Sequence, residues 1–332
     1  MSEAIRFSVV IPVKNDEGNI FKCLSSLVHL SYPSEQFEVI VVDNGSTDGT
    51  LAVVEGFRSS LPLCILVRPN IYISALRNAG VLVARGEWIA FLDSDCETKP
   101  DWLLEAQKAI SEGIVGVFGS FYVIPPGSSW IARTWYGERE WKPKGEISYL
   151  PAGNLFIKKQ NFEALGGFNA NIQTNEDFEL CERARHAGFS VLCIPEVGVI
   201  HWGTPQTLRE FYKKNRWHGT HVLRVFLQNF PRLLNLKPLL LAFYTALCLL
   251  GGLFCLAFAI FTGHTTPLLI VITALLLPPC LLGLTAAAKT NKPESALPMA
   301  TLFLVYALAR ASCLVQTPSW RTGKRLHEAD SL

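Results

Sequence analysis

Two long apolar segments near the C-terminal end constrain the fold of this 332-residue chain more than any other feature. Pro238–Thr262 and Thr266–Ala288 contain no Asp, Glu, Lys or Arg. About 20 apolar residues are enough for a helix to cross the hydrocarbon core of a bilayer. We therefore predict two transmembrane helices, joined by the uncharged connection Gly263-His264-Thr265.

A third apolar segment, Ala296–Gln316, carries Arg310 near its centre, where a charge that faces lipid costs at least ~2.5 kcal/mol. We predict that this segment is a tilted interfacial or re-entrant helix on the inner side, with a third span as the alternative. The basic residues that flank the first two spans predict a hairpin with both ends in the cytosol, in a multi-pass protein of the inner, cytoplasmic membrane. These residues are Arg232, Lys237, Lys289 and Lys292.

The N-terminal part alternates between short, β-branched apolar runs and helical patterns, which predicts an α/β fold with a mostly parallel sheet and helices on both faces. An irregular, mobile loop is expected at Pro125–Pro143. The expected strands are Phe7–Pro12, Phe37–Val42, Leu63–Val67, Trp88–Leu92, Gly113–Val123 and Ser148–Ile157, with two short ones in Val191–Ile200. The expected helices are Gly18–Leu30, Asp48–Ser60, Ile73–Ala84, Asp101–Glu112 and Glu176–Ala187.

Residues 207–235 are basic and aromatic, which is typical of a helix in a membrane interface. A helix docked on the N-terminal domain with a solvated basic face is the alternative. The expected domains are a catalytic domain over 1–205, interface helices over 206–236, a membrane region over 237–318 and a cytosolic tail over 319–332.

Composition excludes several classes of protein. The net charge is only +2, so no nucleic-acid partner is expected. The nine cysteines form no C-x-x-C pair, which favours a reduced, cytosolic setting over a zinc or disulfide framework. The N-terminus lacks the basic and apolar regions of a signal peptide, and none is expected.

The apolar run Trp88–Leu92 ends in two carboxylates, Asp93 and Asp95. Ligands bind at the carboxyl ends of strands in such sheets, and two hard oxygen ligands there suit Mg²⁺ or Mn²⁺. The alternative is a solvated turn that caps the next helix. Asp43 ends the second strand in a similar turn. No G-x-G-x-x-G follows the first strand, which disfavours a dinucleotide fold.

Six segments occur together in a specific order. They are Val10-Ile11-Pro12-Val13-Lys14-Asn15, Val41-Val42-Asp43-Asn44-Gly45-Ser46-Thr47-Asp48, Ala75-Leu76-Arg77-Asn78-Ala79-Gly80, Asp93-Ser94-Asp95, Gly166-Gly167-Phe168 and Asn175-Glu176-Asp177. Over roughly the first two-thirds of the chain, they resemble the inverting family-2 glycosyltransferases, which have the nucleotide-sugar-binding GT-A fold. Lys14 departs from the family, where an aromatic residue is common.

The resemblance implies a role for each matched residue, beginning with Asp177 as the catalytic base. Asp43 would contact the nucleotide base with Arg77 nearby, and Asp95 would ligate the metal. Lys213 replaces the glutamine of a Gln-x-x-Arg-Trp motif that processive members carry. The implied donor-binding residues are Pro12, Asn15, Glu17, Asp43, Arg77, Asp93 and Arg216. The implied metal ligands are Asp95, Asp93 and His201. The implied acceptor-binding residues are Gly153, Asn154, Glu176 and Trp217.

The chemistry of these residue types agrees with those roles, because a leaving diphosphate needs a cation and an acceptor hydroxyl needs a base. We predict a membrane-bound, inverting glycosyltransferase with a cytosolic active site and a divalent cation. Its donor would be a UDP-sugar, with a GDP- or dTDP-sugar as alternatives, and its acceptor a lipid-linked glycan or polysaccharide. The alternatives are a polyprenyl-phosphate glycosyltransferase and a non-catalytic scaffold that binds nucleotide sugars.

Overall fold

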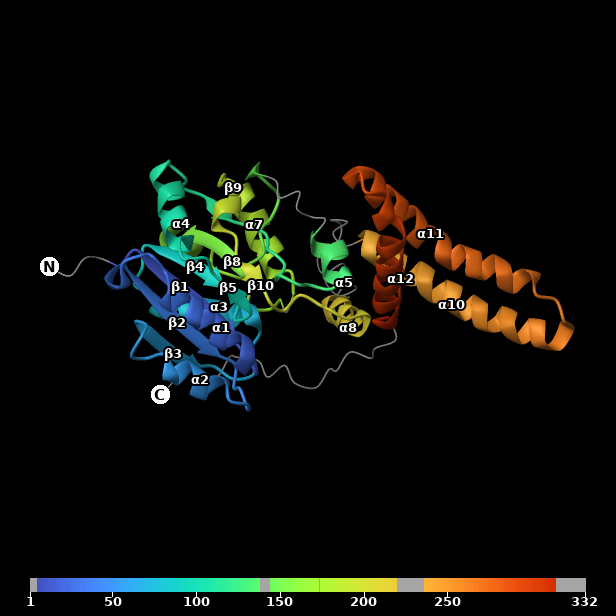
Figure 1. Cartoon of the computed structure of the whole chain (residues 1–332), viewed down its shortest axis with the longest axis horizontal. Helices are drawn as coiled ribbons and strands as arrows, with labels where there is room; N and C mark the ends of the chain where they lie inside the picture. The colour runs from blue at the N-terminus through green and yellow to red at the C-terminus, as the bar shows by residue number, and fades with distance from the viewer. Residues whose placement is uncertain (1–4, 138–143, 173, 220–235, 315–332) are drawn as a thin grey trace. The chain divides into compact units, whose positions relative to one another are not determined.

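The computed structural model describes residues 5–137, 144–172, 174–219 and 236–314. The chain divides into two compact units, which Figure 1 colours by position along the chain. The first unit comprises the residues up to Ser128 and Tyr136–Thr204. The second comprises Ser129–Trp135 and the residues from Pro205 onward.

The first unit is built on one large sheet. Its strands are β1 (Phe7–Val13), β2 (Phe37–Asp43), β3 (Leu63–Val67), β4 (Trp88–Leu92), β6 (Val117–Gly119), β7 (Gly145–Glu146), β8 (Asn154–Lys158) and β9 (Val191–Cys193). They lie in the order β3-β2-β1-β4-β8-β6-β9-β7. The pairs among the first four strands are parallel, whereas β8 runs antiparallel to both β4 and β6. The predicted mostly parallel sheet is confirmed.

Helices cover both faces of this sheet, as the alternating pattern predicted. They are α1 (Glu17–Val28), α2 (Thr50–Gly56), α3 (Ile73–Val83), α4 (Trp102–Ser111), α6 (Lys159–Ala164) and α7 (Glu176–His186), with the short turns η1 (Ser34–Gln36) and η4 (Pro195–Val197).

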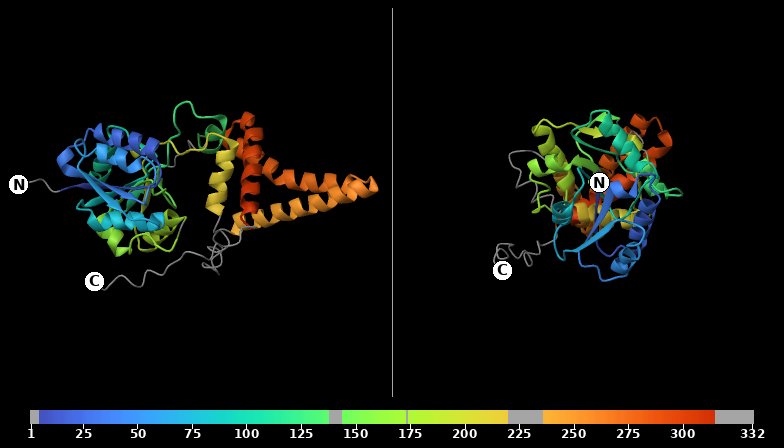
Figure 2. Two further views of the ribbon diagram at one scale, coloured as in Figure 1. Left: turned by 90° about the horizontal axis from the view of Figure 1, so that it is seen from below. Right: turned by 90° about the vertical axis from the view of Figure 1, so that its left-hand side faces the viewer.

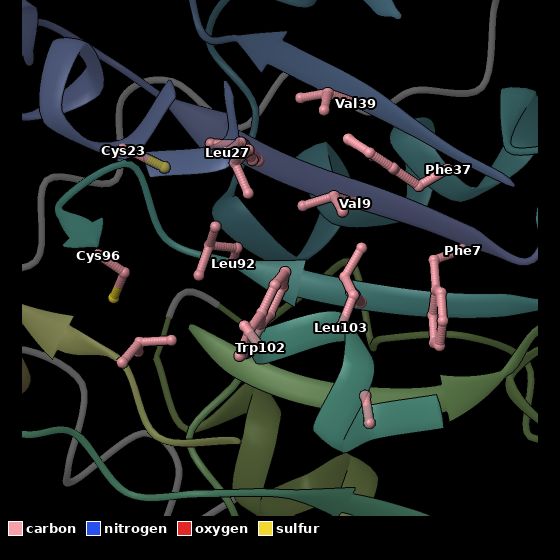
Figure 3. Close-up of a cluster of buried hydrophobic side chains, with 14 of the residues drawn as sticks. Phe7, Val9, Cys23, Leu27, Phe37, Val39, Leu92, Cys96, Trp102 and Leu103 are labelled. Carbon is pink, nitrogen blue, oxygen red and sulfur yellow. The ribbon is translucent and has the colours of Figure 1, made fainter. Parts of the chain in front are cut away.

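Two apolar cores lie on opposite faces of the sheet because successive strand residues point to opposite sides. Val9 packs in one core with Leu27 of α1 and Trp102 of α4, and Figure 3 shows this cluster. The neighbouring Val10 packs in the other core with Leu76 of α3. The sheet is thus buried on both faces, which fits its continuous apolar strands.

The later strands are shorter than predicted. The strand expected over Ser148–Ile157 begins only at Asn154, whose N–H donates to the Pro151 carbonyl at 3.2 Å in a turn. The strand expected over Gly113–Val123 is limited to β6, because Gly113 has a φ of +98° at the end of α4. Of the two strands expected within Val191–Ile200, β9 joins the main sheet. The other, β10 (Ile200–His201), pairs with β5 (Cys96–Glu97) in a separate two-stranded sheet.

The irregular loop predicted from Pro125 is partly helical. Within the described residues it contains α5 (Trp130–Ala132) and a π-helical turn, η2 (Arg133–Gly137). Ser129 precedes α5, and its hydroxyl accepts a hydrogen bond from the Ala132 N–H at 3.5 Å. The rest of the predicted loop includes residues 138–143, which lie outside the described ranges.

The described residues of the second unit from Pro205 onward form a series of helical elements. They are α8 (Leu208–Gly219), α10 (Leu236–Thr262), α11 (Thr266–Thr290), η5 (Pro293–Ser295) and α12 (Ala296–Ser312). Three helices are long and apolar enough to span a membrane: Leu239–Thr262, Thr266–Thr290 and Pro293–Ser312. α10 and α11 lie side by side (Figure 2). They leave large apolar side chains such as Phe254 and Phe261 exposed.

Two contacts join these apolar helices at the backbone. Gly283 of α11 lies so close to α12 that an added Cβ would be 2.7 Å from the Ala300 nitrogen. Pro278 has no N–H for the carbonyl of Ala274, four residues earlier. The Tyr244 hydroxyl of α10 donates to that carbonyl at 2.6 Å instead. The phenol therefore satisfies an acceptor that the proline would otherwise leave unpaired in an apolar helix.

α8 packs along α12 within the second unit. Phe211 is fully buried in a cluster with Ile131 of α5 and Leu302 of α12. Further along both helices, the Cys313 thiol donates to the Arg216 carbonyl at 3.2 Å. α8, the described part of the basic, aromatic segment, therefore has an apolar side that packs on an apolar helix, whereas residues 220–235 of that segment lie outside the described ranges.

Arg310 lies in the last turn of α12, because this helix ends at Ser312 rather than at Gln316. The prediction that placed it near a helix centre was therefore wrong. Its guanidinium carbon is 4.8 Å from the centroid of the Tyr306 ring. An added Cβ at Gly219 of α8 would be 3.2 Å from the Arg310 Cδ. Arg310 therefore faces α8, which covers it with protein.

Candidate active site

Polar side chains gather where the parallel strands end, at the edge of the sheet where α/β folds bind ligands. Asn15 follows β1, and Asp43 is the last residue of β2. Asp93 and Asp95 follow β4. The structure thus brings together the loops in which the sequence placed the donor and metal sites.

Asp43 is fully buried, and its carboxylate organises its own turn. It accepts hydrogen bonds from the N–H groups of Gly45 and Ser46 at 2.8 and 2.9 Å, and from the Ser46 hydroxyl. Asn15 ties this turn to the loop after β1, because its side-chain oxygen accepts from the Thr47 N–H at 2.8 Å. Its φ of 50° lies in the left-handed region, which asparagine tolerates. The predicted base contact of Asp43 stays a prediction.

Arg77 of α3 forms a bridge between two carboxylates. Its Nη2 donates to Asp93 Oδ1 at 2.7 Å, and its Nη1 donates to Glu176 Oε1 at 2.6 Å. The Arg77 side chain is 2% exposed. The sequence assigned Arg77 to the nucleotide and Glu176 to the acceptor. In the structure the two residues pair with each other, so Arg77 reaches both sides of the site.

The second oxygen of Asp93 is also engaged. The Tyr122 hydroxyl donates to Asp93 Oδ2 at 3.2 Å. Gly153 packs against the same carboxylate so closely that an added Cβ would overlap Asp93 Oδ2. Gly153 therefore shapes the site by its lack of a side chain. Nothing in the sequence pattern marks Tyr122, because it is one aromatic residue in a stretch rich in them.

Asp95 faces His201 of β10. The distance from His201 Nε2 to Asp95 Oδ2 is 3.5 Å, and His201 Nδ1 lies 3.1 Å from the Thr204 hydroxyl. An added Cβ at Gly203 would overlap Asp95 Oδ2. The antiparallel pairing of β5 and β10 explains how residues so distant in sequence meet.

The turn that carries His201 is held by its neighbour Trp202. The Trp202 N–H donates to the Asp95 carbonyl at 2.7 Å, and its indole N–H donates to Glu97 at 2.7 Å. The Lys22 ammonium lies 3.6 Å from the centroid of the indole ring. The position of His201 relative to Asp95 is therefore fixed by backbone and side-chain contacts together.

The acids and the histidine at this edge offer a small set of donors for a divalent cation. Within the described parts of the chain, no three His, Cys, Asp or Glu side chains are grouped as a metal site. Asp95 and His201 face each other and are the pair that could share a cation, whereas the predicted ligation by Asp93 stays a prediction. One carboxylate and one imidazole suit a cation that takes its other ligands from phosphate oxygens and water.

Asp177 lies in the first turn of α7, after Asn175 with its φ of 65°. Its Oδ1 accepts from the Phe178 N–H at 2.7 Å and its Oδ2 from the Ala152 N–H at 3.4 Å. Burial, and then the adjacent Glu176 carboxylate, raise the pKa of Asp177 to about 7, although the backbone donors and Arg77 oppose the shift. A carboxylate with a pKa near neutrality is well matched to proton transfer.

Asn154 has a place that the sequence did not suggest. It is fully buried, and its side-chain oxygen accepts from the Trp102 indole at 3.2 Å. Its amide donates to the Val197 carbonyl at 2.9 Å and to the Ser120 carbonyl at 3.3 Å. These bonds join α4, η4 and the residue after β6 in the core, and they leave Asn154 facing away from solvent. The predicted contact of Asn154 with the acceptor stays a prediction.

The remaining predicted residues have different surroundings. Pro12 is buried within β1, and the Glu17 carboxyl lies against Gly49 after β2. Arg216 and Trp217 are exposed on α8 in the second unit, so their contacts with the diphosphate and acceptor stay predictions.

The glycosyl transferase family 2 model matches residues 8–168. The chain is 32% identical over 226 residues to glycosyltransferase AglE of Haloferax volcanii, a match that covers 66% of this chain and 74% of AglE. It spans less than two thirds of the length of several further curated relatives.

Solved structures with low sequence identity share the fold. One is PcManGT, a mannosyltransferase from Pyrobaculum calidifontis that was solved with GDP-Man and Mn²⁺. The match has a TM-score of 0.59 at 18% sequence identity, and it covers 94% of this chain and 87% of the PcManGT chain. Another is Staphylococcus aureus TarS, solved with UDP-GlcNAc. The match has a TM-score of 0.50 at 22% sequence identity, and it covers 66% of this chain and 67% of the TarS chain. These likenesses, the AglE match and the GT-A architecture agree. The chain belongs to glycosyltransferase family 2.

Proposed function

We propose that this glycosyltransferase moves a sugar from a cytosolic nucleotide sugar to a lipid-linked glycan or polysaccharide acceptor, with inversion at the transferred carbon. The observation that carries the proposal is the chain of contacts Asp93–Arg77–Glu176, which ends next to Asp177. It joins the acids after β4 to a carboxylate suited to act as a base.

The donor would be a nucleoside diphosphate sugar, with a UDP-sugar as the first choice and a GDP- or dTDP-sugar as alternatives. TarS was solved with UDP-GlcNAc and PcManGT with GDP-Man, which supports the class of donor. The loop of Asn15 and Asp43 at the carboxyl edge would receive the nucleoside. The acids after β4 would then lie beside the ribose and diphosphate.

Asp95 and His201 would hold a divalent cation, Mn²⁺ or Mg²⁺, with Asp93 beside it. PcManGT was solved with Mn²⁺, which supports the use of a divalent cation. When bound, the cation would neutralise charge that develops on the leaving diphosphate. Because Gly203 has no side chain, the Asp95 carboxylate can lie directly against the turn that carries His201.

Asp177 would accept the proton of the acceptor hydroxyl while the hydroxyl oxygen forms the new glycosidic bond. The bond from the sugar to the diphosphate breaks, and the diphosphate leaves with its electron pair. A single displacement of this kind inverts the configuration at the transferred carbon. Loss of a general base typically costs ~10²–10⁴-fold in rate.

Membrane attachment would place the site near a lipid-borne acceptor and raise its local concentration. Three candidate spans support the attachment, and Lys289 and Lys292 support a cytosolic location for the end of α11. We propose the cytoplasmic membrane, with the catalytic unit in the cytosol.

The packing of α8 supports an interfacial position for α12 rather than a third span. α8 carries Lys213 and Arg216 on exposed positions and lies along α12 from Leu302 to Cys313. If this part of α12 crossed the hydrocarbon core, α8 would carry its basic side chains into lipid at a cost of several kcal/mol. An interfacial pair avoids that cost.

The proposal is tested by measuring release of nucleoside diphosphate from the donor by the purified full chain, which is supplied with a membrane lipid extract. UDP-, GDP- and dTDP-sugars are compared with and without Mn²⁺. Asp95→Asn should lose metal-dependent release, whereas Asp101→Asn, which changes an exposed acid with no side-chain cap bond, should retain it. No release from any donor would contradict the enzyme assignment. Release with polyprenyl phosphate alone would contradict the glycan acceptor.

A further inference from the structure

The bridge formed by Arg77 joins three elements that are far apart in the sequence. Arg77 comes from α3, Asp93 follows β4 and Glu176 begins α7. The guanidinium is almost fully buried, and its carbon lies 5.6 Å from the Phe168 ring. Within the described residues, Nε has no hydrogen-bond partner. A buried guanidinium with an unpaired nitrogen is costly, and the two carboxylates offset that cost.

We propose that Arg77 is a positioning residue that sets the distance between the donor side and the acceptor side of the site. This inference rests on the proposed function, in which Asp93 lies beside the donor and Asp177 accepts the proton of the acceptor.

The donor side is fixed because both oxygens of Asp93 have partners. Arg77 binds one oxygen, and the Tyr122 hydroxyl binds the other. Gly153 packs against the same carboxylate on one side. Asp93 therefore has one orientation in the site, and Arg77 provides its only charged partner among the described residues.

The acceptor side is fixed through Glu176, which immediately precedes Asp177. The bond from Arg77 to Glu176 holds the first turn of α7 against the loop after β4. The Asp177 carboxyl is then held by the N–H groups of Phe178 and Ala152. One rigid guanidinium thus determines where the base stands relative to the donor acid.

The role requires arginine rather than a positive charge alone. The planar fork of a guanidinium presents two donors at a fixed separation, and here each donor meets a different carboxylate. A lysine ammonium keeps the charge but does not hold two carboxylates at that spacing. Arg77→Lys should therefore bind donor nearly as well as the wild type, with a fall of about 10–100-fold in kcat.

The charge of Arg77 also affects the base. The titratable groups that influence Asp177 or are influenced by it are Glu176 and Cys181 on α7, Arg77 on α3, and Tyr122. Without the guanidinium, the N–H groups of Phe178 and Ala152 remain, but the charge that offsets the repulsion between Glu176 and Asp177 is lost. Arg77→Met should move the acid limb of the pH–rate profile to higher pH, and Arg77→Met with Glu176→Gln should move it back.

The experiment measures kcat, donor Kd and pH–rate profiles for these three variants of the full chain, and thermal unfolding reports whether each one folds. Arg85→Met is the matched control. Arg85 forms an ion pair at 2.8 Å with Glu38, which lies near the start of β2, at the opposite end of the strand from Asp43. This control variant should leave kcat unchanged.

Three outcomes decide the matter. A fall in kcat for Arg77→Lys with a nearly unchanged donor Kd supports positioning. A rise in donor Kd with unchanged kcat in Arg77→Lys makes Arg77 a nucleotide contact and overturns the proposal. The proposal is also overturned if the folded double variant keeps the wild-type kcat and the acid limb of Arg77→Met does not move. If the wild-type chain releases no nucleoside diphosphate from any donor, the proposed function is refuted rather than the positioning role of Arg77.

Discussion

Asp177→Asn should slow transfer and stabilise the protein at the same time. Burial and Glu176 raise the pKa of Asp177 from 3.8 to about 7. A shift of about three units, at 1.36 kcal/mol per unit, corresponds to a cost of about 4 kcal/mol for the ionised carboxylate in the folded state. Because Asp177 is only half-buried, we expect about 2 kcal/mol.

The sign of this effect depends on pH. A carboxyl with a raised pKa favours folding below its unfolded pKa, and this contribution is lost as the pH rises through the folded value of about 7. Asparagine carries no charge at either pH. The variant should therefore gain stability relative to the wild type between about pH 5 and about pH 8.

Thermal unfolding of both proteins in the same detergent measures the gap in Tm at these two pH values. At roughly 2–4 °C per kcal/mol, the gap should widen by several degrees at the higher pH. Transfer should fall by ~10²–10⁴-fold while donor binding is retained. Asp101→Asn controls for a general effect of removing an acid. A gap in Tm that does not change with pH, or transfer at the wild-type rate, would refute the reasoning.

The other structural features give three further expectations. Gly203→Ala would drive its Cβ into Asp95, so metal-dependent nucleotide release should fall about as far as in Asp95→Asn, whereas the thermal unfolding of the catalytic unit should change little. Tyr244→Phe removes the donor that satisfies a helix carbonyl beside a proline, and unfolding in detergent should show a loss of about 1 kcal/mol. An equal or larger loss for Tyr72→Phe, at an exposed tyrosine of the first unit, would contradict that account. In intact cells, an impermeant thiol reagent should label a cysteine placed at Thr265 and spare one placed at Ser319, in a chain whose other reactive cysteines are replaced; labelling at Ser319 would establish a third span.

The parallel half of the fold could be predicted because its signals are local. Each strand from β1 to β4 is a short apolar run, and each is followed by a helical pattern. The acids stand at the ends of those runs, so Asp43, Asp93 and Asp95 could be placed at one edge of the sheet in advance. Strand bounds were correct to within a residue or so for this reason.

The other half depends on contacts between distant residues. No local signal shows that β8 inserts between β4 and β6, or that β10 leaves the main sheet to pair with β5. Arg77 and Glu176 are 99 residues apart, so their pairing follows from the tertiary fold and not from either motif. The same holds for Asn154, which was expected in a strand but whose side chain also binds Trp102, Ser120 and Val197 in the core.

Ser129–Trp135 belongs to the second unit although it lies in the middle of the catalytic sequence. Its partners Phe211 and Leu302 are translated much later, and Leu302 emerges from the ribosome only after both helices of the hairpin. Chains are synthesised at about 5–20 residues per second, so Ile131 and Trp135 wait many seconds for the surfaces that bury them. The sheet can close around β9 before that time. The hairpin of α10 and α11 is therefore complete before the last step of assembly, and a ribosome that stalls before α12 leaves the aromatic segment without Leu302 to pack on.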